Sequence, residues 1–114
     1  TQYIDDFDPA GGTPALWSTV PSGRSMFGYS SFGTDVSKVT YWTGSACQGA
    51  TSTPSTTLLY RGFTTSASPT IATRASTTTP SGIDTTICYA VEQKNVYIGS
   101  GVYTATITAT ATTL

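Results

Sequence analysis

A strict alternation of apolar residues and threonine constrains the fold of this chain more than any other feature. From position 103 to position 112, every odd position is apolar and every even position is threonine. Successive side chains of a β-strand point to opposite faces of a sheet, so this period predicts a half-buried strand. Its apolar face would carry Tyr103, Ala105, Ile107, Ala109 and Ala111. Such a strand either completes the sheet of its own domain or pairs with a neighbouring subunit.

The other segments of the chain favour strands and turns, because no stretch of useful length has a helical period. We expect strands within residues 38–43, 58–63, 85–91 and 96–98, and shorter ones near 3–4 and 71–72. Gly62 indicates a bulge, residues 92–95 are polar and indicate a turn, and residues 13–34 favour short strands or irregular loops. Six to eight short strands predict one all-β domain over residues 1–114, an antiparallel β-sandwich of immunoglobulin-like or jelly-roll type.

Two cysteines, Cys47 and Cys88, lie 41 positions apart, too far for a CxxC redox or zinc motif. They are either two buried thiols or one structural disulfide, and a secreted chain would favour the disulfide. In the chain-entropy model, closing a loop of this length contributes on the order of 4 kcal/mol.

The composition indicates an extracellular or cell-surface protein and excludes several functions. Charged residues make up 10% of the chain, against about 25% in typical soluble domains, while Thr and Ser together supply roughly a third. A net charge of -1 and scattered basic residues give no electrostatic footprint for nucleic acid. No apolar run is long enough to span a bilayer. Residues 64–82, rich in Thr, Ser and Pro, predict O-glycosylation.

The sequence argues against an enzyme. It contains no histidine, which removes Ser-His-Asp and Cys-His arrangements and most catalytic zinc sites. Glu92 is the single glutamate, and the spacing of the carboxylates suggests no glycosidase pair. We therefore expect no catalytic residue and no required cofactor.

An acidic cluster and several aromatic residues are candidates for ligand binding. Asp5, Asp6 and Asp8 could contribute oxygens to Ca²⁺, although a solvated acidic turn is the simpler explanation for them. The phrase Ile-Asp-Asp-Phe-Asp at positions 4–8 resembles the opening strand of some carbohydrate-binding jelly rolls. Trp17, Tyr29 and Trp42 could stack on sugars, or they could be core residues.

The second half of the chain carries two further resemblances. Cys88-Tyr89-Ala90, a hairpin-like segment and the alternating strand resemble strands F and G of immunoglobulin-like domains, over about the last thirty residues. Thr86 stands where an antibody-type domain has its corner tyrosine, and Trp42 precedes Cys47, which argues against the usual disulfide between strands B and F. The run from Gly101 to Thr110 is similar to the last strand of bacterial or archaeal surface domains and of fimbrial, pilin-like subunits.

Three functional hypotheses follow. The first is a non-enzymatic structural module, either a pilus or filament subunit or an adhesin domain, which associates with itself or with neighbouring domains through β-strand pairing. The second is a carbohydrate-binding module assisted by Ca²⁺. The third is an ice-binding surface, because the threonine row resembles Thr-x-Thr arrays; a single row makes no plane, and solvent-facing threonines are normal in strands.

Overall fold

The computed structural model describes residues 3–8, 14–17, 21–36, 59–63, 69–77 and 79–112. Regular structure within these ranges consists of five β-strands, with no α-helix, in agreement with the all-β prediction. The predicted strand at 38–43 lies outside them. The sandwich architecture, the number of strands in the whole chain and the disulfide stay predictions.

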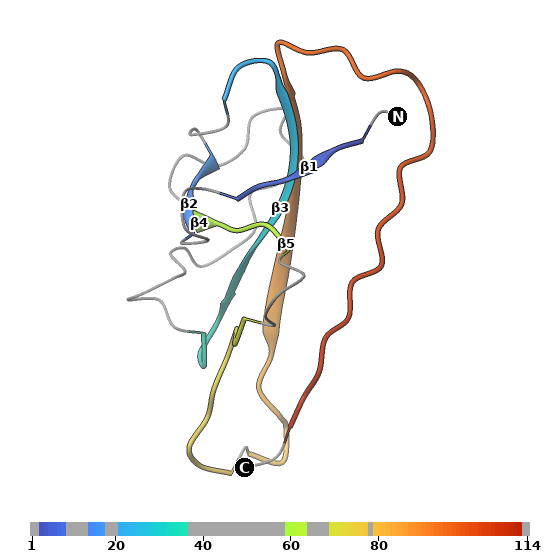
Figure 1. The fold of residues 1–114 in the computed structure, drawn as a ribbon. Coiled ribbons are helices and arrows are strands. Elements are labelled where there is room, and N and C mark those ends of the chain that lie inside the picture. Colours follow the sequence, from blue (N-terminus) through green and yellow to red (C-terminus); the bar gives the residue numbers. More distant parts are fainter. Residues whose placement is uncertain are drawn as a thin grey trace.

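The strands form two sheets, which lie one beside the other in Figure 1. The larger sheet has the order β1-β3-β5, with β1 at Asp5–Asp6, β3 at Arg24–Gly33 and β5 at Thr85–Lys94. The smaller sheet pairs β2 (Ala15–Leu16) with β4 (Leu59–Tyr60) in antiparallel fashion. We predicted antiparallel pairing throughout, but the short β1 runs parallel to β3.

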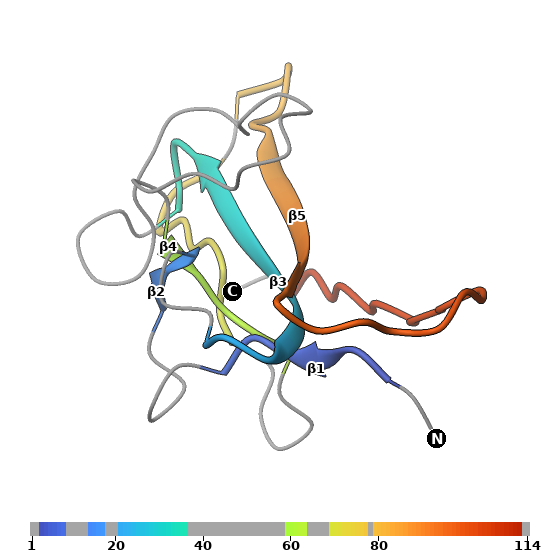
Figure 2. The same cartoon turned by 90° about the horizontal axis from the view of Figure 1, so that it is seen from above.

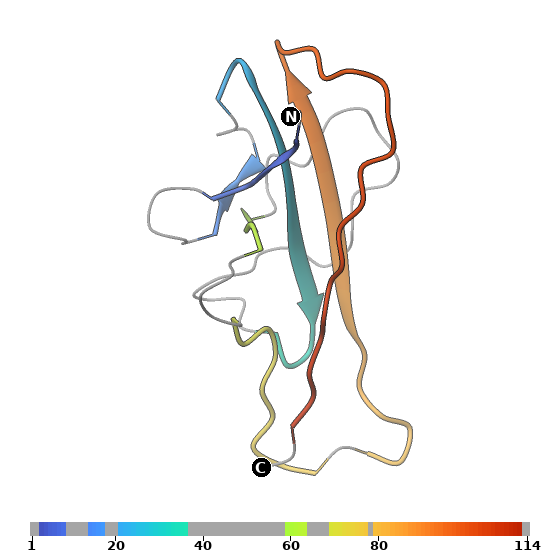
Figure 3. The ribbon, with the colours of Figure 1, turned by 45° about the vertical axis from the view of Figure 1, so that its right-hand side comes forward.

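The longest element is the antiparallel ribbon formed by β3 and β5, which Figure 3 shows from the side. Ten pairs of opposed residues join the two strands, from Arg24 and Lys94 at one end to Gly33 and Thr85 at the other. Two predictions were wrong here. β3 is one long strand rather than short pieces, and β5 continues through the polar residues 92–94 because they have partners on β3. The turn comes at Asn95, whose φ is 54°.

The face of the ribbon toward β2 and β4 carries the first core cluster. Phe7, Trp17, Met26 and Tyr60 are buried there. The Trp17 ring lies between the other two aromatic rings, with centroids 4.8 Å from Phe7 and 5.0 Å from Tyr60. Gly28 makes room for this packing, since a Cβ at that position would lie 2.9 Å from the Phe7 Cβ.

The opposite face of the ribbon carries a second, smaller cluster around Tyr29 and Val36. The partly buried side chains packed against it are Phe63, Ile71, Ala72 and Ile87. The predicted strand at 71–72 is reduced to one bridge, between Ala72 and Val36. An ion pair between Arg74 Nε and Asp35 Oδ2 at 2.9 Å fastens residues 69–77 beside the end of β3.

Gly62 marks a close backbone approach, not the bulge we predicted. A Cβ at this position would lie 2.5 Å from the Phe7 carbonyl oxygen. The segment at 59–63 can therefore pass the end of β1 only because this residue has no side chain.

Residues 95–112 form no strand. The predicted strand at 96–98 is irregular, although Ile98 is buried. Residues 102–112, which we call the threonine segment, are extended and run back past the ribbon on the side opposite β2 and β4 (Figures 1 and 2). The segment with the clearest strand pattern thus lies outside both described sheets.

Candidate functional site

The threonine segment offers a row of backbone groups and side chains to solvent. Every residue from 102 to 112 is exposed, including the five predicted strand-pairing residues. Tyr103 and Ile107 are the most covered of the large apolar side chains there, at 40% and 42% exposure, against 92% for Val102. The Tyr103 hydroxyl donates a hydrogen bond to the Gly99 carbonyl at 2.8 Å. No other described residue forms a β-ladder with this segment.

The edge of β5 that faces away from β3, which we call the β5 edge, is the second exposed backbone row. On β3 the opposite edge is occupied, because β1 pairs with Met26 and Phe27 and an antiparallel bridge joins Tyr29 to Arg61. β5 ends the sheet order, and no strand among the described ranges pairs with its outer side. Among the described residues, the ribbon therefore has one edge that is paired and one edge that is open.

The hydrogen bonds of β3 show which β5 residues point outward. Tyr29 N–H donates to the Arg61 carbonyl and Arg61 N–H donates to the Tyr29 carbonyl, both at 2.8 Å, on the side of β3 away from β5. Tyr29 stands opposite Tyr89, so these two residues form a non-hydrogen-bonded pair of the β3–β5 ladder. The N–H and C=O of Tyr89 therefore point to the β5 edge. Residues two positions away, Ile87 and Val91, point the same way.

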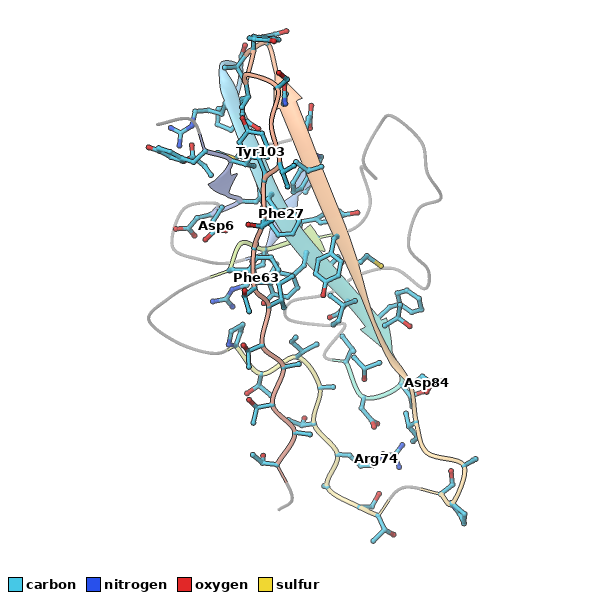
Figure 4. The ribbon with its side chains drawn as sticks, turned by 90° about the vertical axis from the view of Figure 1, so that its right-hand side faces the viewer. Asp6, Phe27, Phe63, Arg74, Asp84 and Tyr103 are labelled. Carbon is cyan, nitrogen blue, oxygen red and sulfur yellow. The ribbon has the colours of Figure 1, made fainter. Side chains whose placement is uncertain are left out.

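An aromatic surface lies beside this edge, on the ribbon face opposite β2 and β4. We call Phe27, Tyr29, Phe63 and Tyr89 the aromatic strip. Phe63 lies 4.6 Å from Tyr29 and 5.3 Å from Phe27, and Phe27 lies 6.1 Å from Tyr89, measured between ring centroids. Tyr89 is 52% exposed, and its neighbour Val91 is 57% exposed. Figure 4 shows the threonine segment, with Tyr103, crossing in front of Phe27 and Phe63.

The acidic residues do not converge on one point. Asp5 forms an ion pair with Arg24 at 2.5 Å, between Oδ2 and a guanidinium nitrogen. Partial burial raises the pKa of Asp6, a backbone hydrogen bond from Phe63 opposes this, and the charges of Asp8 and Asp5 add to the rise. Within the described ranges, no group of three His, Cys, Asp or Glu residues could hold a metal ion. A calcium site at Asp5, Asp6 and Asp8 stays a prediction.

Two of the three predicted sugar-stacking residues are core residues. Trp17 is 1% exposed and Tyr29 is 3% exposed, so neither ring can present a face to a sugar. Burial also raises the pKa of Tyr29, with the nearby Arg61 charge opposing it. Trp42 lies outside the described residues.

The two cysteines are only partly described. Cys88 is buried on β5 opposite Ser30. Cys47 lies outside the described residues, so the disulfide between them stays a prediction.

Sequence reasoning missed the β5 edge and the aromatic strip. A signal for them was available, because large apolar side chains occupy every second position in two stretches. These are Ile87, Tyr89 and Val91 in one stretch, and Phe27 and Tyr29 in the other. The pattern places each set on one face of its strand. It does not reveal that the two strands pair or that the outer side of β5 has no described neighbour.

Comparison of the chain with protein-family models, curated proteins and solved structures finds no match. Among the residues that the structure describes, no helix has the length and apolar character needed to cross a membrane.

Proposed function

We propose that this protein is a non-enzymatic, extracellular structural module, a pilus or filament subunit or an adhesin domain, that assembles through β-strand pairing. One observation carries the proposal: a segment with strict strand periodicity is extended and exposed, with no ladder partner in the described chain. Pairing it with a strand would satisfy its row of N–H and C=O groups and bury its alternate apolar side chains. The low charge of the chain, 10%, allows close packing of subunits.

The threonine segment also lacks the features that protect exposed strands in monomers. Monomeric proteins place Lys, Pro or bulges on such edges to prevent pairing with other chains. Residues 102–112 contain no charged residue and no proline. A long uncharged segment of this kind favours association.

The assembly state of the purified chain tests this proposal. Negative-stain electron microscopy and a sizing column should show filaments or large multimers, and deletion of residues 104–114 should convert them to monomers. Thr106→Pro should weaken assembly because it removes a backbone donor, whereas Thr106→Val keeps that donor and the β-propensity and should assemble normally. A full-length chain that stays monomeric at all concentrations would contradict the proposal.

An extracellular location predicts two covalent features. Intact mass measurement should show a loss of two hydrogens from a disulfide between Cys47 and Cys88. O-linked sugars would add mass above that of the sequence, and Ser76, Thr77 and Thr79 are exposed positions at which they could be attached. A bare, fully reduced chain from its native source would count against secretion.

A second candidate function, sugar binding, rests on Tyr89. Its ring is the exposed member of the aromatic strip, next to Phe27, and sugars stack on exposed aromatic faces. A glycan screen with and without Ca²⁺ tests this. Binding that Tyr89→Ala abolishes and that Tyr97→Ala, at another exposed tyrosine, leaves intact would favour the sugar-binding module over the structural one.

A further inference from the structure

Two exposed backbone rows in one chain do not meet each other. One row is the threonine segment and the other is the β5 edge, and neither has a ladder partner among the described residues. We propose that the β5 edge of one copy accepts the threonine segment of a second copy as an added strand beside β5. This inference rests on the proposed assembly function and names its acceptor.

The acceptor and donor match in length. β5 has ten residues, Thr85–Lys94, and the threonine segment has eleven, residues 102–112. Because alternate residues of β5 point their N–H and C=O outward, the open groups recur every second residue, the same period at which the apolar residues of the segment recur. A ladder along the full length of β5 is therefore available.

The side chains match in character as well. The outward-pointing residues Ile87, Tyr89 and Val91 have their side chains on the ribbon face of the aromatic strip, since Ile87 packs in the cluster around Tyr29. A strand added with Tyr103 and Ile107 on that face would extend the strip and cover the exposed flanks of Tyr89 and Val91. Its threonines would then lie on the other face. The stretch Thr85–Val91 has no charge to oppose such pairing.

The path of the chain after β5 argues for a second copy rather than for pairing within one chain. Asn95 Nδ2 donates to Ser22 Oγ at 2.9 Å, and Gly23 N–H donates to the Lys94 carbonyl at 2.6 Å. These bonds hold the start of the connection against the turn that precedes β3, which is the side of β5 away from its open edge. The threonine segment then crosses over the open ribbon face (Figure 4) and leaves the β5 edge uncovered by any described residue.

Each copy would contribute one donor segment and one acceptor edge. These are different surfaces, so the contact is heterologous, and it continues from copy to copy unless the copies close into a ring. A filament therefore follows from the same contact without a second interface.

A mixing experiment with two complementary variants tests the inference. The first variant lacks residues 102–114 and keeps the acceptor edge. The second variant, Val91→Pro, keeps the segment and loses an outward-pointing N–H at the edge. Each alone should be monomeric in sedimentation velocity, and an equimolar mixture should form a 1:1 dimer of twice the monomer mass that grows no further. Val91→Lys, at a 57% exposed position, is the second edge variant in case the proline disturbs folding, and Ser76→Lys is its matched control.

The four outcomes separate this inference from the function on which it rests. Wild-type polymers together with a 1:1 dimer in the mixture support both. Wild-type polymers that persist in Val91→Lys as in Ser76→Lys would overturn the β5 edge as acceptor and leave assembly standing. A wild-type chain that never assembles would overturn both the assembly function and the β5 edge as acceptor. If the wild type assembles but the two folded variants form no dimer when mixed, only the β5 edge as acceptor is overturned.

Discussion

The β3–β5 ribbon and the threonine segment both contain about ten residues of strand-forming sequence, but they differ in strand pairing and in burial. β5 and the segment are both about ten residues long, and both are rich in the β-branched residues that favour strands. β5 pairs with β3 over its whole length, and Cys88 on it is buried. The threonine segment is exposed throughout and pairs with no described strand. A period of two therefore specifies which side chains share a face, whereas a partner strand decides whether a sheet forms.

Core packing covers much of the ribbon. Trp17 and its aromatic neighbours cover one face of the ribbon, and the cluster around Tyr29 covers part of the other. No residue of the threonine segment belongs to either cluster, and the hydroxyl of Tyr103 donates a hydrogen bond to nearby Gly99. Four predictions follow, from the largest expected effect to the smallest; the first tests this contrast directly, and the others test contacts that hold the ribbon and its neighbouring segments.

Truncation of a core ring should have the largest effect. Trp17→Ala should lower the free energy of unfolding by about 3–5 kcal/mol because it leaves a cavity between Phe7 and Tyr60. Ile107→Ala, in the threonine segment, should change the stability of the monomer by less than about 0.5 kcal/mol. Urea titration of both variants at low protein concentration gives the two values. Equal losses would mean that the segment packs as firmly as the core.

Crowding the contact between β1 and the segment at 59–63 should come next. Gly62→Ala places a Cβ against the Phe7 carbonyl and should destabilise the protein by about 1–3 kcal/mol. Gly101→Ala is the matched control, because the nearest atom to its added Cβ is 3.9 Å away. Thermal unfolding should separate the two variants clearly. A Gly62→Ala protein as stable as Gly101→Ala would refute the close approach.

Removal of the ion pair beside the end of β3 should have a smaller effect. Arg74→Ala frees the largely buried carboxylate of Asp35 and should lower stability by about 1 kcal/mol. Arg24→Ala breaks the more exposed pair with Asp5 and should lower it less. Salt should weaken the effect of Arg24→Ala more strongly, because screening acts mainly on exposed pairs. Denaturation at low and high ionic strength measures both differences.

The pH dependence at Asp6 should be the smallest effect. Its pKa in the folded protein is raised above 3.8, so the folded state binds the proton more tightly than the unfolded state. The resulting stabilisation is complete below pH 3.8 and is lost as the pH rises through the folded pKa. As the pH rises through this range, the Asp6→Asn protein should therefore lose less stability than the wild type. An Asp6→Asn protein whose pH profile of stability is identical to that of the wild type would refute the shift.

The sequence predicted the all-β class, but it did not predict which strands pair with each other. The stretch 85–91 predicts a strand, whereas the polar residues that follow predict a turn, because their partners on β3 are remote in sequence. Trp17 and Tyr29 had the same aromatic character as Tyr89, and only the fold shows that the first two are buried and the third is exposed. The β5 edge could not be predicted, because an edge is defined by the arrangement of other strands.

Residue-resolved hydrogen exchange, in dilute monomer and in assembled protein, tests the central claim most directly. In the monomer, the amides of Tyr89, Val91 and the threonine segment should exchange rapidly, while the amide of Ala90, which points toward β3, should be protected. In the assembled protein, Tyr89, Val91 and the segment should become protected together. Protection of the segment in the monomer would show pairing within one chain. Continued rapid exchange of the segment in assemblies would show that strand addition at the β5 edge does not hold them together.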